Sequence, residues 1–288
     1  MKVKPECLTC LFERATYMCD LVVEDEKVKF EALKELLDYA SKNFSRDSVP
    51  AIIGTKRENI IKKYSGSDDP YEELKKKSNE VAEELLPIAE NFYNNSSDKL
   101  EALIRIMATA NSMEYGVRGH SFDHETFGQV FEETLRERLV GDIDKIRSRI
   151  DGQNKILYIL DNCGEDIFDI FAIDRLVEMG KEVVTAPKTE PIINDATVKD
   201  LIEAGFKHKV VPSGPCIGVN PEMSTEEFLD LFWNPEYLIL AKGMGNYETI
   251  SEFEGELKGR LIYILRAKCN SVASNLEVNR GELVARLV

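Results

Sequence analysis

The spacing of apolar residues changes once along this chain, near residue 150. Before that point apolar side chains recur every three or four residues, as at Leu11 and Ala15, which is the spacing of amphipathic helices. After it, short apolar runs alternate with helical segments, starting with the run at 155–160. Strands that alternate with helices form a mostly parallel sheet whose faces the helices cover. We therefore predict an all-α domain at 1–150 and a Rossmann-like α/β domain at 151–288, with helices on both faces of its sheet.

Turn and capping residues bound the individual elements. In the second half the predicted strands are 155–160, 182–186, 209–211, 237–241 and 260–267, and the predicted helices are 166–179, 197–204 and 225–233. In the first half we expect Asp98 to cap one helix and Ser121 or Asp123 to begin another. Pro87 should kink or stop the helix that contains it, because proline lacks the N–H that an inner helical turn requires.

Charge and hydropathy exclude several classes of protein. The 288 residues carry a formal net charge of −15, whereas a nucleic-acid partner requires a basic face. The basic run Lys75–Lys77 follows acidic residues and is expected to be the solvated face of a helix. No stretch approaches the roughly 20 apolar residues that span a bilayer, and the N-terminus lacks a signal-like apolar block. We expect a cytoplasmic protein with no nucleic-acid or membrane partner, and its oligomeric state stays open.

The six cysteines are too scattered for the dense disulfide framework of a secreted protein. Cys7 and Cys10 form the only CxxC and would share one face of a helix, whereas Cys19 would point elsewhere. A zinc site generally needs four ligands, and no second CxxC or histidine pair follows at the required spacing. Buried packing thiols, a redox pair and a metal site therefore all stay open for Cys7 and Cys10.

Polar residues gather in three segments of the second half. The segments are Asp161-Asn-Cys-Gly-Glu165, Pro191-Ile-Ile-Asn-Asp-Ala-Thr197 and Ala241-Lys-Gly-Met-Gly-Asn-Tyr-Glu248. Parallel strands place their carboxyl ends at one edge of the sheet, where ligands of open α/β sheets bind. Each segment alone has a simpler explanation, because its Asp or Asn residues could cap the following helix and Lys242 could be a solvent-exposed lysine. Together the segments predict one polar crevice.

The joint chemistry of these residues is that of a phosphate site beside a divalent cation. The carboxylate and amide oxygens of Asp161, Asn162 and Asp195 are ligands that Mg²⁺ or Mn²⁺ prefers. Lys242 would counter the charge of a bound phosphate. The predicted phosphate-binding positions, most of them in a glycine-lined turn, are Gly164, Gly243, Gly245 and Asn246. A bound ion would polarise the phosphoryl group and lower the pKa of a water molecule, so we predict hydrolysis of a phosphate ester with Asp161 and Lys242 as catalytic residues.

The helical half contributes a fourth candidate, at the end of an apolar helix. Asn111 and Glu114 stand three residues apart and would share a helix face, where they could hold substrate hydroxyls or position the attacking water. The simpler interpretation is a polar helix terminus. His120 and His124 have a spacing that suits a metal site or a catalytic pair, but a helix that begins between them would separate their side chains.

These clusters, in this order, resemble the metal-dependent damage-control phosphatase family, formerly a domain of unknown function, and look closest to its archaeal and bacterial branch with an N-terminal CxxC. The resemblance covers nearly the whole chain. It rests on Glu6-Cys-Leu-Thr-Cys10, Pro50-Ala-Ile-Ile-Gly54, Asp161-Asn-Cys-Gly-Glu165, Pro191-Ile-Ile-Asn-Asp-Ala-Thr197, Ala241-Lys-Gly-Met-Gly-Asn246 and Ala267-Lys-Cys269.

The resemblance implies a helical domain joined to an α/β domain, with one divalent ion at their interface. By motif, Asp161, Asn162 and Asp195 would be the ligands of the ion, and Lys242 would contact the phosphate. Asn111 and Glu114 would face the same site, although the branch commonly has Gly-Asn-x-x-Asp where Ala110 and Glu114 stand here. The implied substrates are sugar phosphates and damaged phosphometabolites, and the implied ions are Co²⁺, Ni²⁺, Mn²⁺ or Mg²⁺.

Three other functions stay open. A haloacid-dehalogenase-type phosphatase with an aspartyl nucleophile usually has a second acid two residues later, where this chain has Cys163. An S-adenosylmethionine-dependent methyltransferase would need a glycine-rich loop after the first strand, where Gly164 is the only glycine. A non-catalytic metal- or metabolite-binding protein would use the same pocket without turnover. Gly243 and Gly245 lack the third glycine of a dinucleotide loop, so we expect no nucleotide cofactor and a small phosphorylated metabolite as the partner.

Overall fold

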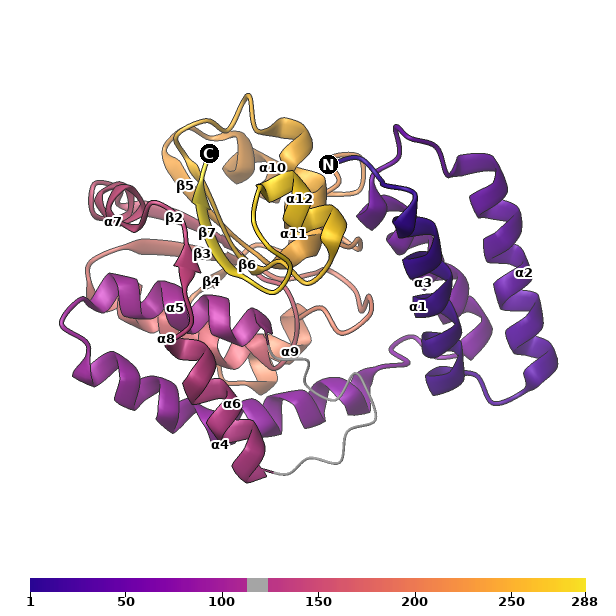
Figure 1. The fold of residues 1–288 in the computed structure, drawn as a ribbon, viewed down its shortest axis with the longest axis horizontal. Helices are drawn as coiled ribbons and strands as arrows, with labels where there is room; N and C mark the ends of the chain where they lie inside the picture. The colour runs from indigo at the N-terminus through magenta and orange to yellow at the C-terminus, as the bar shows by residue number, and fades with distance from the viewer. Residues whose placement is uncertain (113–123) are drawn as a thin grey trace.

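A seven-stranded sheet lies at the centre of the computed structural model, which describes residues 1–112 and 124–288 (Figure 1). Its strands are β1 (Leu139–Val140), β2 (Lys155–Ile159), β3 (Glu182–Ala186), β4 (Lys209–Val210), β5 (Tyr237–Lys242), β6 (Leu261–Arg266) and β7 (Leu283–Leu287). Their order is β1-β7-β6-β5-β2-β3-β4, and every neighbouring pair is parallel except β6 and β7. The predicted mostly parallel α/β sheet is confirmed.

Helices flank the sheet in chain order. Those before β2 are α1 (Glu6–Val22), α2 (Glu26–Asn43), α3 (Pro50–Ser65), α4 (Glu72–Asn95), α5 (Lys99–Ser112), α6 (His124–Leu135) and α7 (Ile143–Asp151). Those after it are α8 (Glu165–Glu178), α9 (Val198–Glu203), α10 (Glu226–Trp233), α11 (Gly243–Ile250), the 3₁₀ turn η1 (Ser251–Phe253) and α12 (Asn270–Leu276). As predicted, Asp98 caps α5, because its Oδ1 accepts the backbone N–H of Glu101 at 3.0 Å. None of the helices described is both long and apolar enough to cross a membrane, and the cytoplasmic location stays a prediction.

The strands send alternate side chains into two apolar layers. Ile156 and Tyr158 of β2 belong to a buried cluster shared with α4, α5 and α8. Leu157 and Ile159 belong to another cluster, shared with α10, α11 and α12. Figure 1 shows α4, α5, α6 and α8 on one side of the sheet and α10 to α12 on the other. The predicted helices on both faces of the sheet are therefore confirmed.

Elements that precede the predicted domain boundary at residue 150 pack on strands that follow it. β1, at 139–140, pairs with β7, and α5 packs on β6 and β7. The first three helices instead stand together at the end of the sheet (Figure 1) and form their own apolar cluster around Met18 and Leu36. That cluster includes Ile192 and Ile193 from the loop after β3, which joins these helices to the α/β layers. The division into two domains stays a prediction.

Two local predictions in the helical half need correction. α4 does not stop at Pro87, which lies inside the helix, so the predicted stop is wrong and the alternative of a kink stays a prediction. The residues Leu85 and Ala89 on either side of it are buried, and burial of this apolar stripe outweighs the cost of about 3 kcal/mol of an internal proline. In the same helix Lys75 is only 2% exposed and pairs with Asp69 at 2.7 Å and with Asp200 at 2.9 Å. The basic run that contains Lys75 is therefore not wholly solvated.

Candidate active site

β2 and β5 lie side by side, and the chain leaves them in opposite directions. From β2 it continues to β3 and β4 on one side, and from β5 to β6 on the other. Such a switch point opens a crevice beyond the carboxyl ends of the two strands. Asp161 follows β2 and Gly243 follows β5, and a Cβ added at Gly243 would lie 1.8 Å from Oδ2 of Asp161. The backbone at Gly243 has φ +76°, which side-chain-bearing residues rarely adopt, so this contact requires glycine.

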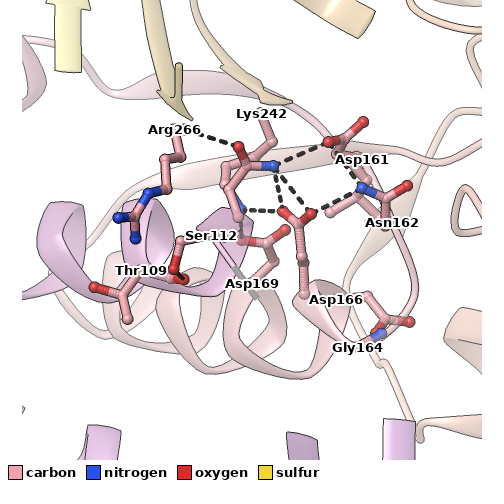
Figure 2. Close-up of polar contacts among 12 residues, drawn as sticks. Thr109, Ser112, Asp161, Asn162, Gly164, Asp166, Asp169, Lys242 and Arg266 are labelled. Atoms are coloured by element: carbon pink, nitrogen blue, oxygen red, sulfur yellow. Dashed lines mark hydrogen bonds and ion pairs between the residues drawn. The ribbon is translucent and has the colours of Figure 1, made fainter. Parts of the chain in front are cut away.

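Two side-chain amides hold the carboxylate of Asp161 in this crevice. Nδ2 of Asn111 and Nδ2 of Asn162 each donate to Oδ2 of Asp161 at 3.0 Å. Both amides also donate to the carboxylate of Glu165, at 2.9 to 3.0 Å. The side-chain oxygen of Asn111 accepts the backbone N–H of Arg266 at 2.9 Å, which fixes the orientation of its amide. These contacts join α5, the end of β2 and the start of α8 into one polar network (Figure 2).

The predicted site residues do not cap the helices that follow them. α8 has Gly164 at its N-cap and no side-chain cap hydrogen bond. α9 is capped by Thr197, with which Asp200 completes a capping box, and not by Asn194 or Asp195. The interpretation of these Asp and Asn residues as simple caps is therefore wrong. The N–H of Gly164 donates to Oδ1 of Asp166 at 2.9 Å, so the structure does not present it to a phosphate.

Asp195 lies beside Asn162, with which it forms a β-bridge. Its side chain is nearly buried, and Nζ of Lys188 lies 3.9 Å from Oδ2 of Asp195. Burial raises the pKa of Asp195 to about 7, against the opposing effect of Lys188. Burial also raises the pKa of Asp161 well above its usual range, and the carboxylates of Glu165 and Asp195 raise it further. This end of the crevice therefore has more negative charge than its own cations offset.

Lys242 lies within this network and is fully buried. Its Nζ pairs with Oδ1 of Asp169 at 2.7 Å and with Oε2 of Glu165 at 3.3 Å (Figure 2). Asp169 also accepts the hydroxyl of Tyr158 at 2.6 Å. Lys242 therefore fixes Glu165, which in turn accepts the amide of Asn111. Its direct contact with phosphate stays a prediction, since the structure engages its ammonium with carboxylates.

A cavity of about 510 Å³ opens over the network, a size that suits a small metabolite. Its walls come from the carboxyl edge of the sheet, α1, α3, α11 and the segment after β6. Of the predicted site residues, those that line it are Asn111, Asp161, Asn162, Asp195 and Gly245. Those that do not are Gly164, Lys242, Gly243 and Asn246. Glu114 and His120 lie outside the described residues.

The glycine-lined turn predicted after β5 is a helix. The positive φ of Gly243 turns the end of β5 directly into α11, so the predicted turn is wrong. Asn246 is buried, and its amide donates to the carbonyl oxygens of Leu160 at 2.9 Å and Lys242 at 2.7 Å. It thereby ties the ends of β2 and β5 together. The first turn of α11, with Gly245, faces the cavity, where free helix N–H groups attract anions.

No role was predicted for Glu165, Asp169 or Lys268. Glu165 and Asp169 stand four residues apart on α8, and this helical spacing was a usable signal. Lys268 is half-buried, follows β6 and lines the cavity. Among the described residues no carboxylate forms an ion pair with its ammonium, although it lowers the pKa of Asp161. Lys268 follows the carboxyl end of a parallel strand, and the same feature of the sequence identified Lys242 as a candidate.

Four cysteines line the same cavity. They are Cys7 and Cys10 of the CxxC, the buried Cys163, and Cys269 at the N-cap of α12. All six cysteines are free, and Cys10 is exposed. In the part of the chain that the structure describes, no group of three or more His, Cys, Asp or Glu residues could hold a metal ion. The exposure of Cys10 contradicts a buried packing role for that thiol, and the redox interpretation stays open.

An open, mostly parallel sheet with a polar cavity at its switch point is the architecture of α/β proteins that bind small molecules beyond the carboxyl ends of their strands. Residues 3–284 match the damage-control phosphatase ARMT1-like domain. The chain is 31% identical over 293 residues to a damage-control phosphatase of Archaeoglobus fulgidus, with 100% of both chains covered. It is 33% identical over 289 residues to a damage-control phosphatase of Pyrococcus horikoshii, covering 99% of this chain and 97% of that one.

A solved structure agrees with these relatives. The crystal structure of a DUF89 family protein from Pyrococcus horikoshii has a TM-score of 0.88 and 32% sequence identity, over 99% of this chain and 98% of that chain. The chain belongs to the damage-control phosphatase ARMT1-like family. The predicted family is confirmed and, at the level of the family, so is the prediction of a phosphatase enzyme.

Proposed function

We propose that this protein hydrolyses phosphate monoesters of small metabolites with the help of one divalent ion. The observation that carries the proposal is the grouping of Asp161, Asn162 and Asp195 in one cavity whose walls also bear cations. The cationic wall residues are Arg14, Arg57, Lys268 and Arg280. This cavity can hold an ion and an anionic ester side by side.

The charges around Asp161 fit a divalent cation. One oxygen of Asp161 and the oxygen of Asn162 have no contact among the residues drawn in Figure 2, and Asp195 lies on the same wall. A dication beside these carboxylates would offset the burial and mutual repulsion that raise their pKa values. This ligand set has two carboxylates and an amide, which suits Mg²⁺, Mn²⁺, Co²⁺ or Ni²⁺ with water and substrate oxygens as further ligands. The bound ion would polarise the phosphoryl group and activate a water molecule.

Lys268 and the N–H groups at the start of α11 would bind the phosphate oxygens. Lys268 supplies an ammonium that no described carboxylate pairs with. The first turn of α11, which brings Met244 and Gly245 to the cavity, supplies N–H groups. The lining holds as many carboxylates as cationic side chains, so an added dication makes the site positive within a chain of net charge −15. A dianionic phosphate would then be attracted to it.

The residues behind Asp161 would keep it in place during turnover. Asn111 and Asn162 use their amides to fix Oδ2 of Asp161, and Lys242 fixes Glu165 behind them. A site held by such rigid contacts loses less rate to reorganisation than a loose one. Lys242 is therefore a positioning residue in this proposal, and Lys268 is the cation that reaches the ester.

A phosphate-release screen tests the proposal. A panel of phosphorylated metabolites is crossed with Mg²⁺, Mn²⁺, Co²⁺ and Ni²⁺, and each active pair is repeated with EDTA and with the Asp161→Ala variant. We expect metal-stimulated release by the wild type and a loss of at least about 100-fold in the variant. Unchanged turnover by Asp161→Ala would refute the assignment. Metabolite binding without product release over hours would favour a binding protein.

A further inference from the structure

Helix α3 presents to the cavity an arginine whose terminal nitrogens have no partner among the described residues. Arg57 is 8% exposed and lines the cavity. Its Nε donates to Oε1 of Glu58 at 2.7 Å. Within residues 1–112 and 124–288, neither Nη1 nor Nη2 of Arg57 makes a hydrogen bond or an ion pair. Because these two donors border the cavity and are not engaged by those residues, they are suited to receive an anionic ligand.

The side chain of Arg57 is held in place from behind. Glu58 is 3% exposed, and its second oxygen accepts the hydroxyl of the buried Tyr71 at 2.9 Å. The chain of contacts from Tyr71 through Glu58 fixes the plane of the guanidinium before any ligand arrives. Such a guanidinium can bind a carboxylate or a phosphate with two parallel hydrogen bonds and loses little side-chain entropy on binding.

Arg57 belongs to a different part of the cavity from Asp161. Gly54, three residues before Arg57, packs against Ile217, because an added Cβ would lie 3.2 Å from Cδ1 of Ile217. Ile217 also packs on Gly245 of α11, so its side chain stands between the α3 and α11 walls. The charge of Arg57 lowers the pKa values of Glu248, Cys10 and Tyr71, whereas Lys268 and Lys242 are the cations that lower the pKa of Asp161. The cavity therefore has two separate cationic positions.

The carboxylates on the cavity wall are engaged by other groups. Glu248 accepts the backbone N–H of Ala51, and burial raises its pKa to about 7, so it is incompletely charged at neutral pH. Glu6 accepts the hydroxyl of Ser271 at 2.5 Å. Neither carboxylate forms an ion pair with Arg57 among the described residues. Arg14 of the neighbouring α1 lines the same cavity and adds positive charge to it.

We propose that Arg57 binds a second anionic group of the substrate, so that the preferred substrates are small phosphate esters that also carry a carboxylate or a second phosphate. The inference rests on the proposed phosphatase function and specifies its substrate class. The cavity of about 510 Å³ has room for a phosphate near Asp161 and a second anion at Arg57. Arg57 is then a specificity-determining residue, because esters without the second anion leave its nitrogens unsatisfied.

Three matched phosphate esters test the inference. Glucose 6-phosphate has no second anion, 6-phosphogluconate has a carboxylate, and fructose 1,6-bisphosphate has a second phosphate. We expect the wild type to prefer one or both of the latter two. Arg57→Gln should lower kcat/KM for the preferred esters by at least about 10-fold, mainly through KM, and change that of glucose 6-phosphate by less than about 3-fold. Equal losses on all three esters, or no loss on any, would overturn the inference.

Further variants and a binding measurement separate this inference from its alternatives. Arg57→Lys should restore part of the preference, and Tyr71→Phe should weaken it while leaving glucose 6-phosphate turnover intact, which also shows that the variant folds. If the wild type releases phosphate neither from these esters nor from any member of the wider panel, the proposed function fails. Titration calorimetry with 6-phosphogluconate and glucose 6-phosphate in Mg²⁺ then decides the inference: weaker binding of 6-phosphogluconate alone to Arg57→Gln supports it, and equal binding by both proteins overturns it.

Discussion

The side-chain amide of Asn111 donates a hydrogen bond to Asp161 at 3.0 Å, and so joins the last turn of α5 to the carboxyl edge of the sheet. The two residues are 50 positions apart in the chain. The backbone N–H of Arg266, at the end of β6, holds the other side of the same amide at 2.9 Å. The position of the central carboxylate therefore depends on contacts from a helix and from two strand ends.

Replacing Lys242 by Met should destabilise the fold strongly. The buried ammonium pairs with Asp169 and Glu165, and removing one partner of a buried ion pair costs about 3–5 kcal/mol because the remaining charge is left uncompensated. Lys155→Met is the matched control, since Lys155 lies on the neighbouring β2 and pairs with Glu236 at the surface, where ion pairs contribute little. Urea denaturation measures both variants. Similar losses in the two would contradict the structural role of Lys242.

Replacing Gly243 by Ala should abolish phosphate release, by at least about 100-fold. The new Cβ would overlap Oδ2 of Asp161, at 1.8 Å, and displace the carboxylate. Gly180→Ala controls for backbone strain alone, because Gly180 has φ +86° and no atom within 4 Å of an added Cβ. Steady-state kinetics should show loss in the first variant and near wild-type turnover in the second. Activity in Gly243→Ala would mean that the position of Asp161 is not essential.

The stability of the protein should fall as pH rises through the acid range, in part because of Asp166. Burial raises the pKa of Asp166 to about 7, although the amide of Asn79 and the N–H of Gly164 lower it. The folded state therefore keeps a proton that the unfolded state loses near pH 4. The Asp166→Asn variant lacks this titration, so its stability should not fall in the same way. The difference in unfolding free energy, variant minus wild type, should therefore grow by a few kcal/mol from pH 4 to pH 7 and then level off. Chemical denaturation at a series of pH values measures it, and a constant difference would contradict the assignment.

The cysteines should differ sharply in their reaction with N-ethylmaleimide. Cys10 is exposed, and Cys7 and Cys269 are partly exposed on the cavity wall. The other three, Cys19, Cys163 and Cys216, are buried, although Cys163 also lines the cavity. Burial raises the pKa of Cys10 and Cys269 as well as that of the three buried thiols, so access to the reagent decides the order. Cys7, Cys10 and Cys269 should be labelled first, with Cys10 fastest. Peptide mass spectrometry follows the order, and uniform labelling would contradict the structure.

Most of the sheet could be predicted from the sequence, because buried strands that alternate with helices have a distinct pattern. The strand predicted at 182–186 coincides with β3, and that at 155–160 ends one residue beyond β2. β1 and β7 were not predicted. β1 has only two residues, too few to show a periodic pattern of apolar side chains. β7 is a five-residue strand at the end of the chain and includes the polar Arg286. Neither short strand can be recognised without the neighbour with which it pairs.

The candidate site was partly predictable for a related reason. The rule that strand ends meet at one edge brought Asp161, Asn162 and Asp195 to one cavity. The rule could not tell which of two lysines at the ends of neighbouring parallel strands opens onto the cavity. Lys242 is buried against Asp169 of α8, whereas Lys268 opens onto the cavity. The difference depends on which helix packs behind each strand, which is a property of the tertiary structure and not of spacing.

Metal-stimulated phosphate release by Asp195→Ala tests the central claim most directly. Asp174→Ala is the matched control, because Asp174 is 43% exposed and pairs with His208 away from the cavity lining. With the best ester and Mn²⁺, we predict that Asp174→Ala keeps wild-type turnover, whereas Asp195→Ala loses at least about 100-fold and needs far more Mn²⁺ for its residual activity. Equal turnover and equal Mn²⁺ dependence in the two variants would contradict a divalent-ion site at Asp161, Asn162 and Asp195.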